Sequence, residues 1–271
     1  MNARNFLVSY SGRVGSTALI DTLKLLPNIV VPVFEELDHF AVEARGEFDL
    51  CNESNIHHHV GGIYADRMDA RLNEGVSTGF KWRVWGDMRE VAQVLIQNDV
   101  LLLNMMRTDI VEFIASLYIS DVVYGEYNTP QFALKDATSE EERLNILFRY
   151  RMQPVDVDVD RYLQLYEERQ AEEVGRFALL RQLQEYGVEI RTILYEDFAY
   201  KRFHFLRQLL PAIGQALPET VPVTKLSKVS LPFPSELFRN RAELMASARL
   251  KQMLAEWEGL VCDAGFLPLA G

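Results

Sequence analysis

Cysteine is nearly absent from this chain, with 2 among 271 residues, at positions 51 and 262. Two isolated cysteines cannot build a disulfide framework, and neither stands in a metal-ligand spacing. No apolar run approaches the length of a membrane span, and the first residues lack the pattern of a secretory signal. These absences predict a protein without a membrane span that works in a reducing, cytoplasmic setting.

Positive charge is also in short supply, because 28 lysines and arginines stand against 39 acidic residues and give a formal net charge of −11. A field of this sign disfavours nucleic acid and anionic membrane surfaces as partners. An anionic ligand would need a local cluster of cations or of backbone N–H groups. Such a cluster is therefore more informative here than it would be in a basic chain.

Short apolar runs alternate with longer amphipathic stretches, which is typical of βα units around a mostly parallel sheet. The sequence predicts an α/β, three-layer fold in one domain over residues 1–271, with residues 121–158 as an insertion that carries a helix. Strands are expected at residues 6–10, 29–34, 78–84, 100–106 and 189–195. Helices are expected at residues 16–26, 87–97, 109–119, 160–186 and 201–213, with loop and short helix at residues 39–77.

One loop between the first strand and the first helix carries most of the functional signal. It comprises Ser11, Gly12, Arg13, Val14, Gly15, Ser16 and Thr17. Backbone N–H groups at a helix N-terminus are unpaired and sit at the positive end of the helix dipole, so they bind anions. Gly12 and Gly15 permit a tight turn, and Arg13 adds a fixed positive charge.

The same loop departs from the nucleotide-hydrolase pattern, which requires Gly-Lys-Ser/Thr with the hydroxyl on Mg²⁺. Ser16 stands where that lysine would be, and the cation is at Arg13 within the loop. A charge at that position reaches the bridging oxygen of a phosphosulfate without a metal. The pattern disfavours an ATPase or GTPase.

The run Arg13-Val14-Gly15-Ser16-Thr17 resembles the 5′-phosphosulfate-binding loop of sulfotransferases that use 3′-phosphoadenosine-5′-phosphosulfate (PAPS), with Val14 the one unusual residue. The resemblance implies a P-loop-like fold, PAPS as co-substrate and no metal. It assigns residues 11–17 to the binding of the donor, and Arg13 also to the stabilisation of the leaving group.

Further segments resemble the same family in the same order along residues 5–245. Arg107 and Ser116 resemble its 3′-phosphate signature, although they are nine positions apart where many members show eight. The segment 79–82 resembles a family strand that lies between the two signatures. The segment 194–198 resembles the family's late Tyr-Glu-Asp-Leu segment, for which a mainly structural role is expected. Lys225, Ser227 and Lys228, followed by residues 238–240, resemble the C-terminal loop that closes over the nucleotide.

The resemblance also indicates candidates for the base that takes the acceptor's proton. Glu35 and Glu36 follow the second strand at the edge where open α/β sheets bind ligands, and Glu36 is slightly preferred. His58, within the run His57–His59, is the other candidate, because histidine titrates near neutrality. Lys81 is either a second cation or the partner of a carboxylate on the sheet.

The acceptor and two alternatives stay open at this stage. A small-molecule or carbohydrate acceptor is expected, including phenols, lipid head groups and peptide tyrosines, and residues 121–158 together with the histidine run are expected to shape its pocket. The aromatic residues Trp82, Trp85, Tyr118 and Tyr124 either line that pocket or belong to the core.

The alternatives to a sulfotransferase are a small-molecule kinase on the same scaffold and a non-catalytic nucleotide-binding member. No pattern in the sequence specifies an oligomeric state.

Overall fold

The computed structural model describes residues 3–12, 14–32, 37, 51–65, 75–123, 125, 134, 137–220, 222, 233–263 and 267–268. The chain divides into two compact units. Unit 1 comprises Met1–Met106, Gly175–Val223 and Gly265–Gly271, and unit 2 comprises Arg107–Val174 and Thr224–Ala264. The single-domain organisation expected from the sequence stays a prediction.

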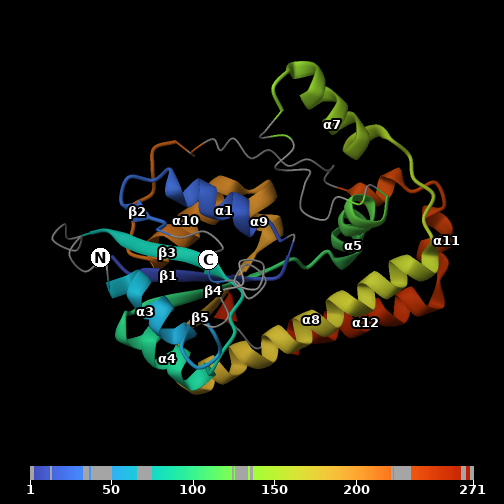
Figure 1. Cartoon of the computed structure of the whole chain (residues 1–271). Coiled ribbons are helices and arrows are strands. Elements are labelled where there is room, and N and C mark those ends of the chain that lie inside the picture. Colours follow the sequence, from blue (N-terminus) through green and yellow to red (C-terminus); the bar gives the residue numbers. More distant parts are fainter. Residues whose placement is uncertain are drawn as a thin grey trace. The chain divides into compact units, whose positions relative to one another are not determined.

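A parallel sheet forms the centre of unit 1 (Figure 1). Its strands are β1 (Asn5–Tyr10), β2 (Ile29–Val30), β3 (Ser77–Trp82), β4 (Val100–Met106), β5 (Ile190–Leu194) and β6 (Leu267–Pro268), in the order β2-β3-β1-β4-β5-β6. Every strand pair is parallel. β1 and β4 are buried along their whole length, as expected for strands with apolar residues on both faces.

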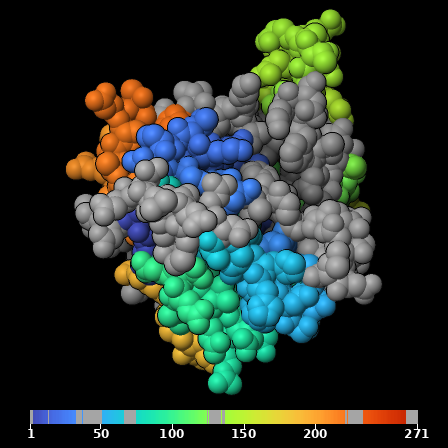
Figure 2. Space-filling model, turned by 60° about the vertical axis from the view of Figure 1, so that its left-hand side comes forward, coloured from blue at the N-terminus to red at the C-terminus, as the bar shows by residue number. Residues whose placement is uncertain are grey.

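Helices cover both faces of this sheet, with α1 (Ser16–Lys24), α9 (Tyr195–Tyr200) and α10 (Arg202–Ala212) on one side and α3 (Ile56–Ala65) and α4 (Met88–Gln97) on the other (Figure 1). Figure 2 shows α3 and α4 side by side at the surface. Asp87 caps α4 by accepting from the N–H groups of Arg89 and Glu90. The three layers confirm the expected α/β, P-loop-like class.

Unit 2 is helical. It contains α5 (Ile110–Tyr118), the π-helix η2 (Ile119–Val123), α7 (Glu140–Met152), the 3-10 turn η3 (Pro234–Leu237), α11 (Arg241–Ala246), α12 (Ala248–Asp263) and residues 159–174 of α8 (Val159–Glu185). The Tyr166 hydroxyl on α8 donates to the Met253 carbonyl on α12 over 2.7 Å. The Tyr162 hydroxyl donates to the Val111 carbonyl on α5 over 2.8 Å. These hydrogen bonds fix α8 against both neighbours.

Several elements differ from the expectation. β2 ends at residue 30, whereas a strand was expected at residues 29–34, and β6 was not expected. The ten-residue helix α3 is the short helix expected within residues 39–77. α7 is the helix expected within residues 121–158. No described helix has both the length and the apolar character to cross a membrane.

Candidate anion-binding site

Gly15 sets the turn between β1 and α1. It is the N-cap of α1 and adopts a left-handed backbone with φ of 77°. A Cβ atom at this position would lie 2.8 Å from the ring of Tyr195. Both the backbone conformation and the close approach of the ring therefore require glycine. Tyr195 belongs to the segment 194–198, so this segment contacts the loop.

The first turn of α1 presents backbone donors. The Leu19 N–H donates to the Gly15 carbonyl over 3.0 Å, which is the first bond of the helix. The N–H groups of residues 16–18 therefore precede the regular ladder. The first turn holds no acidic residue, and no side chain in the described part of the loop caps it. This N-terminus favours an anion.

Hydroxyl groups add to these donors. Ser11 is 1% exposed and Ser16 is 4% exposed, and Gly12 and Val14 are buried beside them. The Ser11 Oγ makes no hydrogen bond to any residue that the structure describes. Because a buried hydroxyl without a partner is unfavourable, a ligand oxygen at this point would satisfy it.

Lys81 brings a buried cation to the loop. It lies on β3, is 1% exposed, and its Nζ donates to the Thr17 hydroxyl over 2.6 Å. The same Nζ lies 4.8 Å from the centre of the Tyr10 ring. The Arg83 guanidinium lies 5.3 Å from the centre of that ring. Lys81 and Arg83 share one side of an extended segment because they are two residues apart. Lys81 therefore places a buried positive charge beside the loop, and its role as a second cation at the site stays a prediction.

Six of the expected site residues lie outside the described residues: Arg13, Glu35, Glu36, Lys225, Ser227 and Lys228. Leu37, next to the glutamate pair, is described. Its carbonyl accepts the indole N–H of Trp82 over 2.9 Å and that of Trp85 over 2.8 Å. Trp82 is fully buried, which favours its core role over a pocket lining. Tyr118 is also buried, and Tyr124 lies outside the described residues.

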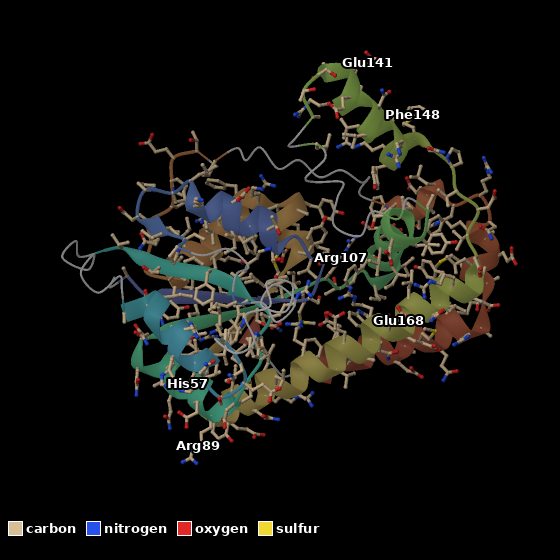
Figure 3. All side chains as sticks on the ribbon, viewed as in Figure 1. His57, Arg89, Arg107, Glu141, Phe148 and Glu168 are labelled. Atoms are coloured by element: carbon tan, nitrogen blue, oxygen red, sulfur yellow. The ribbon has the colours of Figure 1, made fainter. Side chains whose placement is uncertain are left out.

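The three histidines open α3 (Figure 3 labels His57). His57 is half-buried, whereas His58 and His59 are exposed. The rings of His57 and His58 lie 4.0 Å apart between centroids. Among the described residues no group of three or more His, Cys, Asp or Glu side chains is arranged to hold a metal ion.

Arg107 and Ser116 belong to unit 2. Arg107 (Figure 3) follows β4 directly and is 5% exposed. Its guanidinium lies 5.6 Å from the centre of the Phe113 ring. Asp109 caps α5 by accepting from the Glu112 N–H over 3.1 Å. Ser116 is half-buried and stands three residues after Phe113, so both side chains lie on one face of α5.

Glu112 is a buried acidic residue that the sequence analysis did not single out. Its carboxylate accepts from the Ser235 N–H over 2.8 Å and from the Ser235 hydroxyl, which in turn accepts from the Arg241 Nε over 3.1 Å. Burial raises the pKa of Glu112, and the two hydrogen bonds from Ser235 lower it in part. The contact fastens η3 to α5. A lone acidic residue on an amphipathic helix gives no sequence signal for a partner 123 positions away.

Residues 238–240, at the end of the expected C-terminal loop, serve as an anchor. The Asn240 side chain bonds both backbone groups of Val157, accepting over 2.9 Å and donating over 2.8 Å. The Phe238 ring is buried, and Arg239 forms an ion pair with Asp156 at 2.7 Å. These contacts hold the chain that follows residues 223–232 within unit 2.

Comparison with known proteins finds likeness among solved structures. No protein-family model matches the chain, and no curated protein matches it in sequence. Among solved structures, it resembles the crystal structure of a sulfotransferase from Alicyclobacillus acidocaldarius, with 18% sequence identity and a TM-score of 0.46. The match covers 95% of this chain and 100% of that one. Similarity at this level carries no argument about activity, so function must be argued from the chain's own residues.

Proposed function

We propose that this protein is a sulfotransferase that moves the sulfuryl group of PAPS to a hydroxyl or amine acceptor and releases adenosine 3′,5′-bisphosphate. The contact between Lys81 and Thr17 is the observation that carries the proposal. In nucleotide-hydrolase loops the hydroxyl at the position of Thr17 holds Mg²⁺. Here that hydroxyl accepts a hydrogen bond from a buried ammonium group 2.6 Å away. A divalent cation on the same oxygen would be repelled, whereas fixed protein cations suit a donor that reacts without metal.

The loop would bind the phosphosulfate end of the donor. Its N–H groups, together with the hydroxyls of Ser11, Ser16 and Thr17, are donors for phosphate and sulfate oxygens. Negative charge develops on the 5′-phosphate as its bond to sulfur breaks. Arg13 and Lys81 are proposed to stabilise that charge, which is the form of catalysis that preorganised cations supply.

The acceptor would attack sulfur in line with the leaving phosphate. The acceptor oxygen forms a bond to sulfur, the bond between sulfur and the bridging phosphate oxygen breaks, and the acceptor proton passes to a base. Glu36 is the preferred base, with Glu35 and His58 as the other candidates. A carboxylate or an imidazole suits this role because each accepts a proton in the neutral pH range when its surroundings permit.

Arg107 and Ser116 are proposed to bind the 3′-phosphate, with Lys225, Ser227 and Lys228 contacting the same nucleotide. An arginine offers a planar fork of donors that matches phosphate oxygens. Arg107 is buried to 5% exposure and precedes the face of α5 that carries Ser116. The 3′-phosphate distinguishes PAPS from ATP, so these residues would set the choice of donor.

The proposal includes a small-molecule or carbohydrate acceptor and a cytoplasmic setting. Residues 121–158 and the start of α3 are proposed to shape the acceptor pocket. The exposed His58 imidazole belongs to this acceptor-side group. A non-catalytic nucleotide-binding role would retain donor binding but show no transfer to any acceptor.

The test is a transfer assay in excess EDTA that measures adenosine 3′,5′-bisphosphate released from PAPS across phenol, carbohydrate and amine acceptors. Acceptor-dependent release without metal is expected, and ATP with Mg²⁺ should yield no phosphorylated product. The variants Glu36→Gln, Glu35→Gln and His58→Asn identify the base, because only the true base loses turnover while nucleotide binding is retained. Phosphoryl transfer from ATP that requires Mg²⁺ would replace the proposal with the kinase alternative.

A further inference from the structure

A second buried arginine lies beside the ring that Arg107 contacts. Arg169 on α8 is 4% exposed, and its guanidinium lies 5.0 Å from the centre of the Phe113 ring. The Arg107 guanidinium lies 5.6 Å from the same centre. Two guanidinium groups thus share one aromatic ring in the interior of unit 2. An aromatic face offsets only part of the cost of burying such charges.

The donors of Arg169 are not all used. One terminal nitrogen donates to Glu172 over 2.6 Å, and the Glu172 side chain is 44% exposed. The Arg169 Nε is buried and has no hydrogen-bond partner among the described residues. A buried N–H group of a charged side chain costs free energy when it stays unpaired. An anion at this point would accept that N–H.

The surroundings favour a ligand with several oxygens. Phe113 and Ser116 lie on one face of α5, so the half-buried Ser116 hydroxyl stands one turn from the ring that both arginines contact. On one edge of a guanidinium, the Nε–H and a terminal N–H are parallel donors. Their spacing matches two oxygens of a phosphate. Glu173, the neighbouring buried carboxylate on α8, makes contacts of its own.

We infer that Arg169 is a second arginine ligand of the 3′-phosphate, and this rests on the proposed function. Arg169 donates from Nε to a phosphate oxygen while Glu172 holds its terminal nitrogen and fixes the orientation of the group. Arg107 supplies the first cation of the pair, and the Ser116 hydroxyl a further donor. Arg169 is then a determinant of donor choice, because it recognises only nucleotides that carry a 3′-phosphate.

The experiment is calorimetric titration with adenosine 3′,5′-bisphosphate and with AMP, which lacks the 3′-phosphate. Arg169→Met should bind the bisphosphate about ten- to a hundredfold more weakly, the loss expected for one charge-assisted contact, with the affinity for AMP unchanged. Arg169→Lys keeps the charge without Nε and should lose part of the same affinity. Arg161→Met is the matched control, because Arg161 lies on the same helix and pairs with Glu168 at 3.2 Å.

The outcomes separate this inference from the proposed function. A wild-type protein that binds the two nucleotides equally well overturns the proposed function, and the role of Arg169 falls with it. A wild type that prefers the bisphosphate, together with Arg169 variants that keep the full preference, overturns the role of Arg169 alone. If Arg169→Met lowers both affinities equally and reduces the melting temperature, Arg169 is structural.

Discussion

Lys81 Nζ lies 2.6 Å from the Thr17 hydroxyl and 4.8 Å from the centre of the Tyr10 ring. One side chain thereby links β3, the first turn of α1 and the end of β1. Lys81 as a whole residue is 1% exposed, so its ammonium group is surrounded by protein rather than by water. This position places a buried positive charge next to the hydroxyl of Thr17 in the loop.

Replacing Lys81 with Met keeps the length of the side chain and removes the charge. We expect turnover with PAPS to fall by about 10²–10³-fold, the usual effect of removing one group that stabilises transition-state charge. The KM for PAPS should change less, because the charge on the leaving phosphate grows as the reaction proceeds. Steady-state kinetics measures both values.

Lys24→Met is the control for this change, because Lys24 is exposed in the last turn of α1. It removes one positive charge from the same helix at the end remote from the loop. Its kinetics should match those of the wild type. A Lys81→Met protein that is as active as Lys24→Met would exclude Lys81 from the reaction.

Ser11 and Ser9 form a matched pair of buried serines. Both hydroxyls lack a hydrogen-bond partner among the residues that the structure describes, and both residues are at most 1% exposed. Ser11→Ala and Ser9→Ala should each leave the free energy of unfolding unchanged or raise it by about 1 kcal/mol. Only Ser11 lies in the loop, so only Ser11→Ala should weaken binding of adenosine 3′,5′-bisphosphate, by about tenfold. Denaturant unfolding and calorimetry measure these two effects, and equal binding by both variants would remove Ser11 from the site.

Gly15→Ala should lower the free energy of unfolding by about 1–3 kcal/mol, because alanine is strained at positive φ and its methyl group would meet the Tyr195 ring. Gly175→Ala is the matched control in the interior of α8, where an added Cβ meets nothing within 4 Å. That change should raise stability by about 0.5–1 kcal/mol, since alanine favours a helix over glycine. Chemical denaturation measures the free energy of unfolding of both variants. If Gly15→Ala and Gly175→Ala change it in the same direction, the geometry described for the loop is wrong.

Glu112 should make stability depend on pH with a defined sign. Burial raises its pKa, so the folded chain holds the proton more tightly than the unfolded chain. This contribution to stability is fully present below the unfolded pKa and is lost as pH rises through the folded pKa. Relative to Glu112→Gln, which does not titrate, the wild type should therefore lose stability as pH rises above the usual glutamate pKa of about 4.3.

Glu189 provides a comparison of opposite sign. Burial raises the pKa of its carboxyl, but hydrogen bonds from Arg4 at 2.6 Å and Arg191 at 3.0 Å outweigh burial and lower it. Relative to Glu189→Gln, the wild type should gain stability as pH rises toward the usual glutamate pKa of about 4.3. Thermal unfolding across pH measures the stability of the wild type relative to Glu112→Gln and relative to Glu189→Gln. If both differences change in the same direction as pH rises, the environments described for these carboxylates are wrong.

The elements with strong periodic signals were predictable from the sequence. β4 was expected at residues 100–106 and is found there. A short run that is apolar on both faces is typical of a buried strand in a parallel sheet. α8 was expected at residues 160–186 and spans 159–185. The two-residue strand β6 carries too little periodic signal to be assigned, and the short helix expected within residues 39–77 could not be given the bounds of α3. Their positions depend on contacts with distant segments, such as the pairing of β6 with β5.

The candidate site divides in the same way. Local features of the loop were predictable, because Gly15 and the start of α1 follow from residues that are adjacent in the chain. Contacts between distant residues were not. Lys81 meets Thr17 across 64 positions, and Arg169 meets the Phe113 ring from another helix. A charged residue in an amphipathic segment is usually solvated, so only the fold reveals that Arg169 is buried.

Calorimetric titration with adenosine 3′,5′-bisphosphate without Mg²⁺, beside ATP with Mg²⁺, tests the central claim most directly. The wild type should bind the bisphosphate without metal and far more tightly than ATP, and Arg107→Ala should lose that binding. ATP that binds only with Mg²⁺, together with no preference for the 3′-phosphate, would contradict the sulfotransferase assignment and favour a kinase.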